Sequence, residues 1–177
     1  MSAFKKAKVK YLVACSATKR GIYTTAQFLY CSERFNLVKD LMEQTKSEWY
    51  IISAKYGLLR PDEMLYPYDL NLGDLPADRR EKWADSIVDK LAPTHTEFTR
   101  YVILADDLYS ESLAKSFLTH NYKYTVPFWG MSHDKVIEHL KNNQIFATMS
   151  SDEFKKGQKI TLLIIEEGIF TISLGVL

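Results

Sequence analysis

Four short polar segments of the sequence each follow directly on a run of apolar residues, and they carry side chains that could do chemistry. Between them they hold cations, carboxylates, hydroxyls and aromatic rings. A proline-containing stretch at 58–75, which we expect to be irregular, adds two more candidates. This mixture suits a planar ligand that both stacks and hydrogen-bonds, such as a nucleobase or a nucleoside. The candidate residues, in chain order, are Cys15, Ser16 and Lys19; Ser53, Lys55 and Tyr56; Tyr68 and Asp69; Asp106 and Tyr109; and Ser132.

A structural role is an alternative for several of these residues. Cys15 comes directly after an apolar run, which is more typical of a small buried hydrophobe than of a nucleophile. Ser16 fits a turn cap equally well, Lys19 fits a solvated rim, and the dipeptide 68–69 fits a packed turn. Lys55 is different, because it follows a buried run inside the turn Ser-Ala-Lys-Tyr-Gly, and this placement favours a function.

The elements that must position these residues alternate between strand and helix. Apolar runs at 8–14, 49–54, 101–105 and 124–128 are typical of buried strands. The alternation predicts right-handed crossovers, and hence an α/β fold with a mostly parallel sheet and helices on both faces. Ligands bind such sheets outside the carboxyl ends of the strands, where the polar segments would meet. The expected helices cover 24–32, 34–44, 77–91, 108–118 and 133–141, and Ser132 precedes the last of them.

The rest of the chain is expected to complete the same domain. Two apolar segments, 159–165 and 169–174, flank Glu166-Glu167-Gly168, which is a hairpin pattern. The 177 residues are enough to bury one full core. We therefore predict a single α/β domain over 1–177, with a core at about 8–142 and a C-terminal β-hairpin extension at about 150–177.

Composition limits the classes of function. The 23 basic and 22 acidic residues leave a formal net charge of +1, which neither indicates nor excludes nucleic acid, because an enzyme acting on one base needs only a local basic rim. The two cysteines lack zinc-ligand spacing and no glycine-rich nucleotide motif occurs, so we expect no metal and no cofactor. No segment is long enough to span a membrane and the first residues lack a secretory cleavage pattern, which predicts a cytoplasmic protein without a membrane partner.

Five motifs carry a family resemblance, within about residues 9–140. They are Ala14-Cys15-Ser16-x-x-Lys19, Leu29-Tyr30-x-Ser32-x-x-Phe35, Ser53-Ala54-Lys55-Tyr56-Gly57-Leu58, Pro67-Tyr68-Asp69 and Arg80-x-x-Trp83-Ala84, and the second and fourth of these lie on either side of the most specific one, at 53–58. This pattern resembles a family of small uncharacterised bacterial and phage domains, some of them associated with deazaguanine modification of DNA. The first motif is also similar to a Cys-Ser turn with a lysine after it in the uracil-DNA-glycosylase-like domain of archaeosine synthases. The resemblance implies a uracil-DNA-glycosylase-like fold that handles a base, and the company of the family suggests a setting in phage–host conflict.

The residues and the resemblance together predict a DNA N-glycosylase-like enzyme that flips out a base, a modified base above all, and hydrolyses its N-glycosidic bond. Breaking that bond leaves positive charge on the sugar and negative charge on the base. A carboxylate can stabilise the first and orient a water, whereas cations and hydroxyls can stabilise the second. The expected roles are Asp69 as the carboxylate, with Asp106 as its rival; Lys55, Lys19 and Ser16 beside the base or a phosphate; and Tyr56 and Tyr68 stacked on the flipped base.

Three alternatives stay open at this point. Lys55 or Lys19 could act as a nucleophile through a Schiff base in place of water. A non-catalytic module could bind a nucleotide or a modified base without turnover. A hydrolase or deoxyribosyltransferase acting on small nucleosides would need no DNA groove; the near-zero net charge favours it, whereas the basic residues near the expected site favour DNA.

Overall fold

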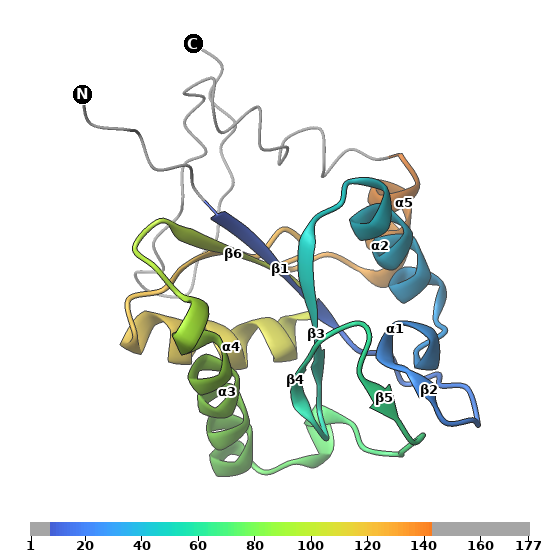
Figure 1. The fold of residues 1–177 in the computed structure, drawn as a ribbon, viewed down its shortest axis with the longest axis horizontal. Coiled ribbons are helices and arrows are strands. Elements are labelled where there is room, and N and C mark those ends of the chain that lie inside the picture. Colours follow the sequence, from blue (N-terminus) through green and yellow to red (C-terminus); the bar gives the residue numbers. More distant parts are fainter. Residues whose placement is uncertain (1–7, 143–177) are drawn as a thin grey trace.

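A five-stranded sheet forms the centre of the computed structural model, which describes residues 8–142 (Figure 1). Strands β3, β1, β6 and β7 lie side by side in that order and run parallel. Strand β4 pairs with the outer side of β3 and runs antiparallel to it. The prediction of a mostly parallel sheet is confirmed. The strand bounds are Lys8–Ala14 for β1, Glu48–Ser53 for β3, Gly57–Leu59 for β4, Thr99–Leu104 for β6 and Lys123–Thr125 for β7.

Helices cover both faces of the sheet, as predicted. Helices α2 and α5 pack against each other on one face, and α3 and α4 pack against each other on the opposite face (Figure 1). Successive residues of a strand point to opposite faces, so Val13 of β1 packs into the first layer and Leu12 into the second. The helix bounds are Glu33–Gln44 for α2, Ala77–Leu91 for α3, Asp107–Thr119 for α4 and His133–Lys141 for α5.

Side-chain caps begin three of these helices. Ser32, Asp106 and Ser132 each accept a hydrogen bond from the backbone amide three residues further on, at 3.3, 3.2 and 3.5 Å. Each bond satisfies one of the donors that the first helical turn leaves unpaired. Asp106 and Ser132 thus begin α4 and α5 within the polar segments that follow β6 and β7.

The stretch 58–75 was expected to be irregular, and this was wrong in part. It contains β4, the short strand β5 and the 3-10 turn η1, and β5 pairs antiparallel with another short strand, β2. The helix expected at 24–32 is likewise reduced to α1, because the residues before it form β2. Elements of two to four residues are too short to show a periodic pattern in the sequence. Their bounds are Thr24–Thr25 for β2, Ala26–Leu29 for α1, Met64–Leu65 for β5 and Leu72–Asp74 for η1.

The fourth predicted strand, 124–128, ends earlier than expected. Strand β7 covers Lys123–Thr125, and the chain then turns, with the Trp129 amide donating to the Val126 carbonyl at 3.3 Å. Pro127 lies inside this turn and has no amide proton with which to continue the ladder. The apolar run at this position therefore forms the end of a strand followed by a packed turn.

The remaining described element is the 3-10 turn η2, Ala92–Thr94, which follows α3. The predicted C-terminal hairpin at about 150–177 lies outside the described residues. Within residues 8–142, no helix is long and apolar enough to cross a membrane.

Candidate functional site

The carboxyl ends of β1, β3 and β6 meet at one edge of the sheet, as the sequence predicts. The Cys15 amide donates to the Ile52 carbonyl at 3.0 Å, which joins the end of β1 to the end of β3. Asp107 Oδ1 accepts a hydrogen bond from the Gly130 amide at 2.9 Å, which joins the segment after β6 to the segment after β7. The polar segments that follow these four strands therefore lie along one edge, which we call the carboxyl edge.

Tyr68, in the segment between β5 and η1, connects that segment to the carboxyl edge. Its hydroxyl lies 2.6 Å from Ser53 Oγ and 2.9 Å from the hydroxyl of Tyr30. Ser53 is fully buried, Tyr30 is 1% exposed and Tyr68 is half-buried. The three hydroxyls form a polar cluster beneath the surface, and Tyr68 is its outermost member.

The turn after β3 is organised by the same serine. Ser53 Oγ accepts hydrogen bonds from the amides of Lys55 (3.3 Å) and Tyr56 (3.1 Å), and the Ser53 carbonyl accepts one from Trp83 Nε1 at 2.8 Å. Gly57 has a φ of 69°, a left-handed conformation that favours glycine. Much of the Ser-Ala-Lys-Tyr-Gly motif therefore shapes the turn, and the side chains of Lys55 and Tyr56 project from it.

Two cations lie against the ring of Tyr68. Lys19 Nζ is 4.3 Å from the ring centroid and Lys55 Nζ is 5.5 Å from it, while the Tyr56 ring packs against it edge-on with centroids 5.2 Å apart. An isolated antiparallel bridge between Lys19 and Tyr30 holds the loop after β1 in this position. Lys19 Nζ donates to the Ala17 carbonyl at 3.3 Å. Within the described part of the chain, neither lysine has a carboxylate within 4.0 Å, so the charge of both is available to an anionic or carbonyl ligand.

Cys15 and Tyr109 extend the cluster along the edge. Cys15 Sγ lies 3.4 Å from the Tyr109 hydroxyl, and the Tyr109 ring meets the Trp83 ring edge-on with centroids 5.4 Å apart. Tyr109 is buried and Cys15 is half-buried against both core layers. This environment favours the structural interpretation of Cys15.

The two candidate carboxylates have different surroundings. Asp106 caps α4 through its bond to the Tyr109 amide, so its oxygen already has a structural partner. Asp69 directly follows Tyr68, is exposed, and makes no hydrogen bond or ion pair with any residue in 8–142. Of the two, Asp69 is the carboxylate available to a ligand. Over the same residues, no three His, Cys, Asp or Glu side chains are grouped so that they could hold a metal ion.

Two further candidates are occupied by local bonds. Ser16 Oγ donates to the Thr18 carbonyl at 2.6 Å, as a turn cap would. Ser132 caps α5 and makes no bond to the Tyr68 cluster among the described side chains. The structure thus groups Lys19, Ser53, Lys55 and Tyr56 around Tyr68, with the Cys15–Tyr109 pair near them, and leaves Ser132 apart.

The phenols of Tyr30, Tyr68 and Tyr109 are protonated at ordinary pH. Burial, with a smaller contribution from the neighbouring Cys15, raises the pKa of Tyr30 to about 12. Burial likewise raises the pKa of Tyr68 and of Tyr109 well above the usual range for tyrosine, again with Cys15 as the next cause. These groups therefore act as neutral hydrogen-bond donors and not as bases.

Tyr30 and Trp83 lie within the family motifs, but sequence reasoning gave neither of them a role in the site. Tyr30 contacts Tyr68 through its hydroxyl, and Trp83 binds the backbone at the end of β3. Both are buried, and in the sequence they look like ordinary core residues. The signal that could have found them is that a buried Tyr or Trp usually has a hydrogen-bond partner for its polar atom.

A small hollow of about 70 Å³ is lined by residues of α3 and α4. None of the predicted site residues lines it. Three of its charged groups have partners already: Arg80 Nη1 donates to the Leu75 carbonyl at 2.6 Å, and Lys115 pairs with Glu111 at 2.9 Å. We therefore place the candidate site at the carboxyl edge and not in this hollow.

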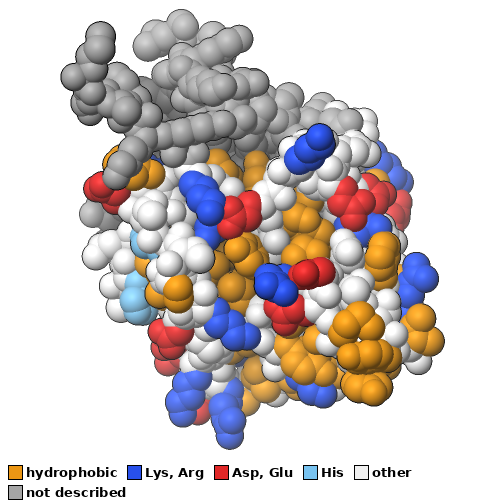
Figure 2. Space-filling model, in the orientation of Figure 1, with side chains coloured by type: hydrophobic (Ala, Val, Ile, Leu, Met, Phe, Trp, Pro, Cys, Tyr) orange, Lys and Arg blue, Asp and Glu red, His pale blue; other side chains and the backbone are white. Residues whose placement is uncertain are grey.

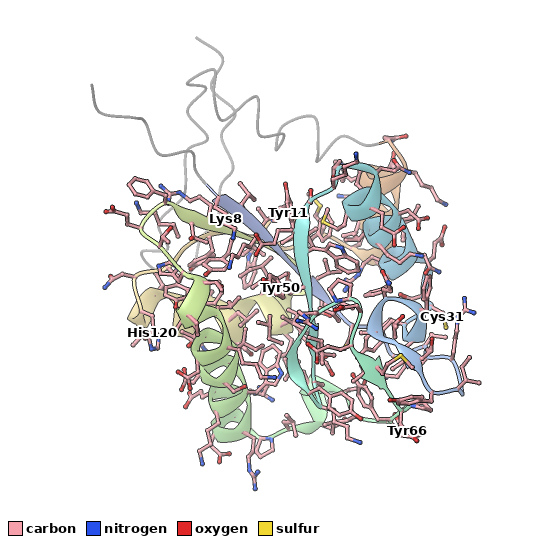
Figure 3. The ribbon with its side chains drawn as sticks, in the orientation of Figure 1. Lys8, Tyr11, Cys31, Tyr50, Tyr66 and His120 are labelled. Carbon is pink, nitrogen blue, oxygen red and sulfur yellow. The ribbon has the colours of Figure 1, made fainter. Side chains whose placement is uncertain are left out.

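An exposed apolar surface adjoins the site. The rings of Tyr23 and Tyr66 lie 4.4 Å apart with a tilt of 34°, and Figure 3 shows Tyr66 at the outer corner of the molecule beyond β5. Tyr66 stands two residues before Tyr68 in the chain, so the surface begins at the edge of the cluster. Figure 2 shows hydrophobic side chains gathered at the lower right, the corner where Figure 3 places Tyr66. Five large exposed side chains of the segments 22–28 and 64–66, each 47–67% exposed, are what we call the apolar corner: Ile22, Tyr23, Phe28, Met64 and Tyr66.

The sequence is similar to a curated relative, the UPF0246 protein Mmwyl1_3597 of Marinomonas sp. (strain MWYL1). The two are 32% identical over 108 residues, which cover 58% of this chain and 42% of the relative. The chain thus spans less than half the length of that protein.

A family model also matches, that of the family of unknown function DUF6884, over residues 11–142. The match includes every candidate residue of the carboxyl edge and most of the chain. The similarity to uracil-DNA-glycosylase-like domains stays a prediction. The chain belongs to the family of unknown function DUF6884.

Proposed function

We propose that the protein is an N-glycosylase-like enzyme that acts on DNA and hydrolyses the bond between a base and its sugar. The expected substrate is a modified base. The observation that carries this proposal is the grouping of an aromatic ring, two cations without carboxylate partners and one free carboxylate at the carboxyl edge. Lys19 and Lys55 lie against the Tyr68 ring, and Asp69 follows it. These are the groups that departure of an anionic base from a cationic sugar requires.

In this proposal each group acts on one part of the reaction. Asp69 stabilises the positive charge on the sugar and orients a water, whose oxygen bonds to the anomeric carbon as the N-glycosidic bond breaks. The base nitrogen leaves with the electron pair of that bond and takes up a proton, so that one water is consumed. Lys19 and Lys55 stabilise the negative charge on the departing base, and the exposed face of Tyr56 offers a stacking surface.

The apolar corner supports DNA over a free nucleoside as the substrate. A nucleoside fills only the cluster around Tyr68, whereas a nucleic-acid strand extends beyond it over neighbouring surface. Exposed aromatic rings stack on successive bases in proteins that bind single strands, and Tyr23 and Tyr66 are half or more exposed beside the site. Arg20, which is also exposed, lies three residues before Tyr23 in the chain and adds a positive charge there.

A non-catalytic binding module is the second candidate, and one observation favours it. Most polar groups of the site already make structural hydrogen bonds: the Asp106 carboxylate and the hydroxyls of Ser16, Ser53 and Ser132. Of the two candidate carboxylates, Asp69 alone has no partner in the described chain. A module of this kind would bind the same ligand with no turnover. The two candidates therefore differ in chemistry and share the same site.

The test is base release. The protein is incubated with DNAs that differ in base modification, and free bases are measured by mass spectrometry. We expect release from at least one DNA, with turnover about 100-fold slower for Asp69→Asn while DNA binding changes little, because Asp69 acts on the charged transition state. Asp62→Asn, in the segment before β5 and 69% exposed, is the matched control and should retain full turnover.

Two results would change this assignment. Saturable binding that survives Asp69→Asn, with no base released from any DNA or nucleoside, would reject the enzyme in favour of the binding module. A covalent protein–DNA adduct trapped by borohydride, and lost in Lys55→Ala or Lys19→Ala, would replace the water by a lysine nucleophile.

A further inference from the structure

The hydroxyls of Ser53, Tyr68 and Tyr30 form a chain whose protons can be counted. Ser53 Oγ and the Tyr68 hydroxyl are 2.6 Å apart, and the Tyr68 and Tyr30 hydroxyls are 2.9 Å apart. A serine hydroxyl has two acceptor lone pairs and one proton to donate. The amides of Lys55 and Tyr56 both donate to Ser53 Oγ, so its lone pairs are occupied and it must donate its own proton to Tyr68.

The remaining bond uses one of the two phenol protons. Either Tyr68 donates to Tyr30, or Tyr30 donates to Tyr68. The Tyr30 hydroxyl also lies near Ser53, but the serine has no lone pair left to accept its proton. Three hydroxyl protons thus serve two bonds, and one phenol O–H has no acceptor among the described residues.

Burial decides where the unused proton lies. A buried O–H without an acceptor costs about 1–3 kcal/mol. Tyr30 is 1% exposed, whereas Tyr68 is half-buried. The lower-energy arrangement has Tyr30 and Ser53 both donating to Tyr68, which leaves the unused proton on Tyr68. Burial also raises the pKa of Tyr68, so the group keeps this proton at ordinary pH.

We propose that the free O–H of Tyr68 is a specificity-determining donor, and that the site selects a base with a carbonyl oxygen, not an amino group, on the edge that enters it. This inference rests on the proposed function for the identity of the ligand as a base. Lys19, 4.3 Å from the Tyr68 ring centroid, favours the same choice, because a cation attracts a carbonyl oxygen and repels the positive end of an amino group. An amino group would also place its N–H donors against the O–H donor of Tyr68, and neither would be satisfied.

The test is a binding measurement that does not depend on catalysis. Three deoxynucleosides with the same purine ring, carrying oxygen, hydrogen or an amino group at position 6, are titrated into the full chain by NMR: deoxyinosine, deoxynebularine and deoxyadenosine. We expect the affinity to fall in that order, with deoxyinosine about tenfold above deoxyadenosine. Deoxyuridine against deoxycytidine tests the same choice at position 4 of a pyrimidine.

Two variants separate the role of Tyr68 from that of the chain as a whole. Tyr68→Phe removes the donor and should abolish the preference for oxygen. Tyr30→Phe, the matched control, also removes one buried hydroxyl but leaves Ser53 donating to Tyr68 and the Tyr68 proton free, so it should keep the preference. Thermal unfolding shows whether both variants are folded. If Tyr68→Phe does not fold, the nucleoside series on the wild type still tests the preference for oxygen.

The proposal is overturned if the wild type prefers the amino ligand, binds none of the nucleosides, or shows the same preference after Tyr68→Phe. It is also overturned if inorganic phosphate binds in a Tyr68-dependent way and displaces deoxyinosine, since the acceptor would then be a phosphate. A preference for oxygen without base release from any DNA would reject the proposed reaction and leave this inference standing.

Discussion

Polar and aromatic side chains gather at both ends of the sheet, and the two ends differ in how far these groups satisfy one another. At the start of the strands, which we call the amino edge, Lys10 is fully buried, with its Nζ 3.5 Å from Glu48 and 3.3 Å from the Thr94 carbonyl. His95 stacks on Tyr122 with ring centroids 3.7 Å apart and bonds to the Tyr101 hydroxyl at 3.1 Å. Figure 3 shows the two ends, with Lys8 at the amino edge and Tyr66 beside the carboxyl edge.

The carboxyl edge has the same kinds of residue with capacity left over. Lys19 and Lys55 lie on aromatic rings without a carboxylate partner in the described chain, and Asp69 is unpaired there. The hydroxyl chain that ends at Tyr68 has one donor too many. Buried charge and stacked rings alone therefore do not distinguish a functional site from a structural one. The useful criterion is unused hydrogen-bonding and ion-pairing capacity at the surface.

The largest expected effect is at the amino edge, where removal of a buried charge should affect stability and nothing else. Lys10→Met leaves the Glu48 carboxylate with Lys8 and Tyr50 as its remaining partners. We expect a loss of about 2 kcal/mol in the free energy of unfolding, because the Thr94 oxygens lose their buried donor while Glu48 is only partly buried; urea denaturation measures this loss. Lys8→Met is the control: its side chain is 52% exposed, so about 0.5 kcal/mol should be lost. If Lys10→Met is folded and its ligand binding is altered, the claim that the amino edge is purely structural is wrong.

The converse is expected at the carboxyl edge, where Lys55→Ala should weaken binding and spare stability. Lys55 is exposed and has no carboxylate partner among the described residues, so its charge is available to the ligand. We expect DNA affinity to fall about tenfold, with a shallower salt dependence if the contact is to phosphate, measured by fluorescence anisotropy at several salt concentrations. Lys90→Ala, on α3 and bonded to the Tyr56 and Leu58 carbonyls, should leave affinity unchanged.

Cys15 sharpens the comparison, because it lies at the carboxyl edge and yet is expected to be structural. Cys15→Ala removes the thiol next to the buried Tyr109 hydroxyl, at a cost of about 1 kcal/mol in stability. Binding and turnover should change less than about twofold, and the wild-type thiol should react slowly with iodoacetamide. Rapid alkylation with complete loss of activity would place Cys15 among the functional residues instead.

The smallest expected effect is the pH dependence of the amino edge. Burial raises the pKa of Glu48, but hydrogen bonds from Lys8 and Tyr50 and the charges of Lys10 and Lys8 outweigh it, and the pKa lies below its ordinary value. The stabilisation is present above about pH 4.3, the ordinary value for glutamate, and is lost as the pH falls through the lowered pKa. The Glu48 side chain is 34% exposed, so solvent screening limits the effect to less than about 1 kcal/mol.

Glu48→Gln should therefore flatten the decline in unfolding free energy below pH 4.3, measured by urea denaturation between pH 7 and 3. Glu43→Gln, exposed on α2, serves as the control and should leave the slope unchanged. Equal slopes for wild type and Glu48→Gln would show that the carboxylate contributes no pH-dependent stability.

The sequence predicts the framework of this fold well, because long buried elements have strong patterns. The strand at 8–14 and the helix at 77–91 have the expected bounds, since each has a continuous apolar run or one apolar face. The short antiparallel pair β2 and β5 could not be predicted, because two-residue strands have no period. The partnership of Tyr30 with Tyr68 depends on a loop that returns 38 residues later in the chain, and residue type alone does not specify that contact.

The account's central claim is that ligands bind at the carboxyl edge, and amide NMR of the full chain with a single-stranded oligonucleotide tests it most directly. The largest shift changes should fall in 15–20, 53–57 and 66–69, with the amino edge at 94–101 unchanged at saturation. Tyr23 and Tyr66 in the apolar corner should also respond if the strand continues beyond the site. Largest changes at 94–101, or around Arg80 and Lys115 in the hollow between α3 and α4, or none anywhere, would contradict the claim.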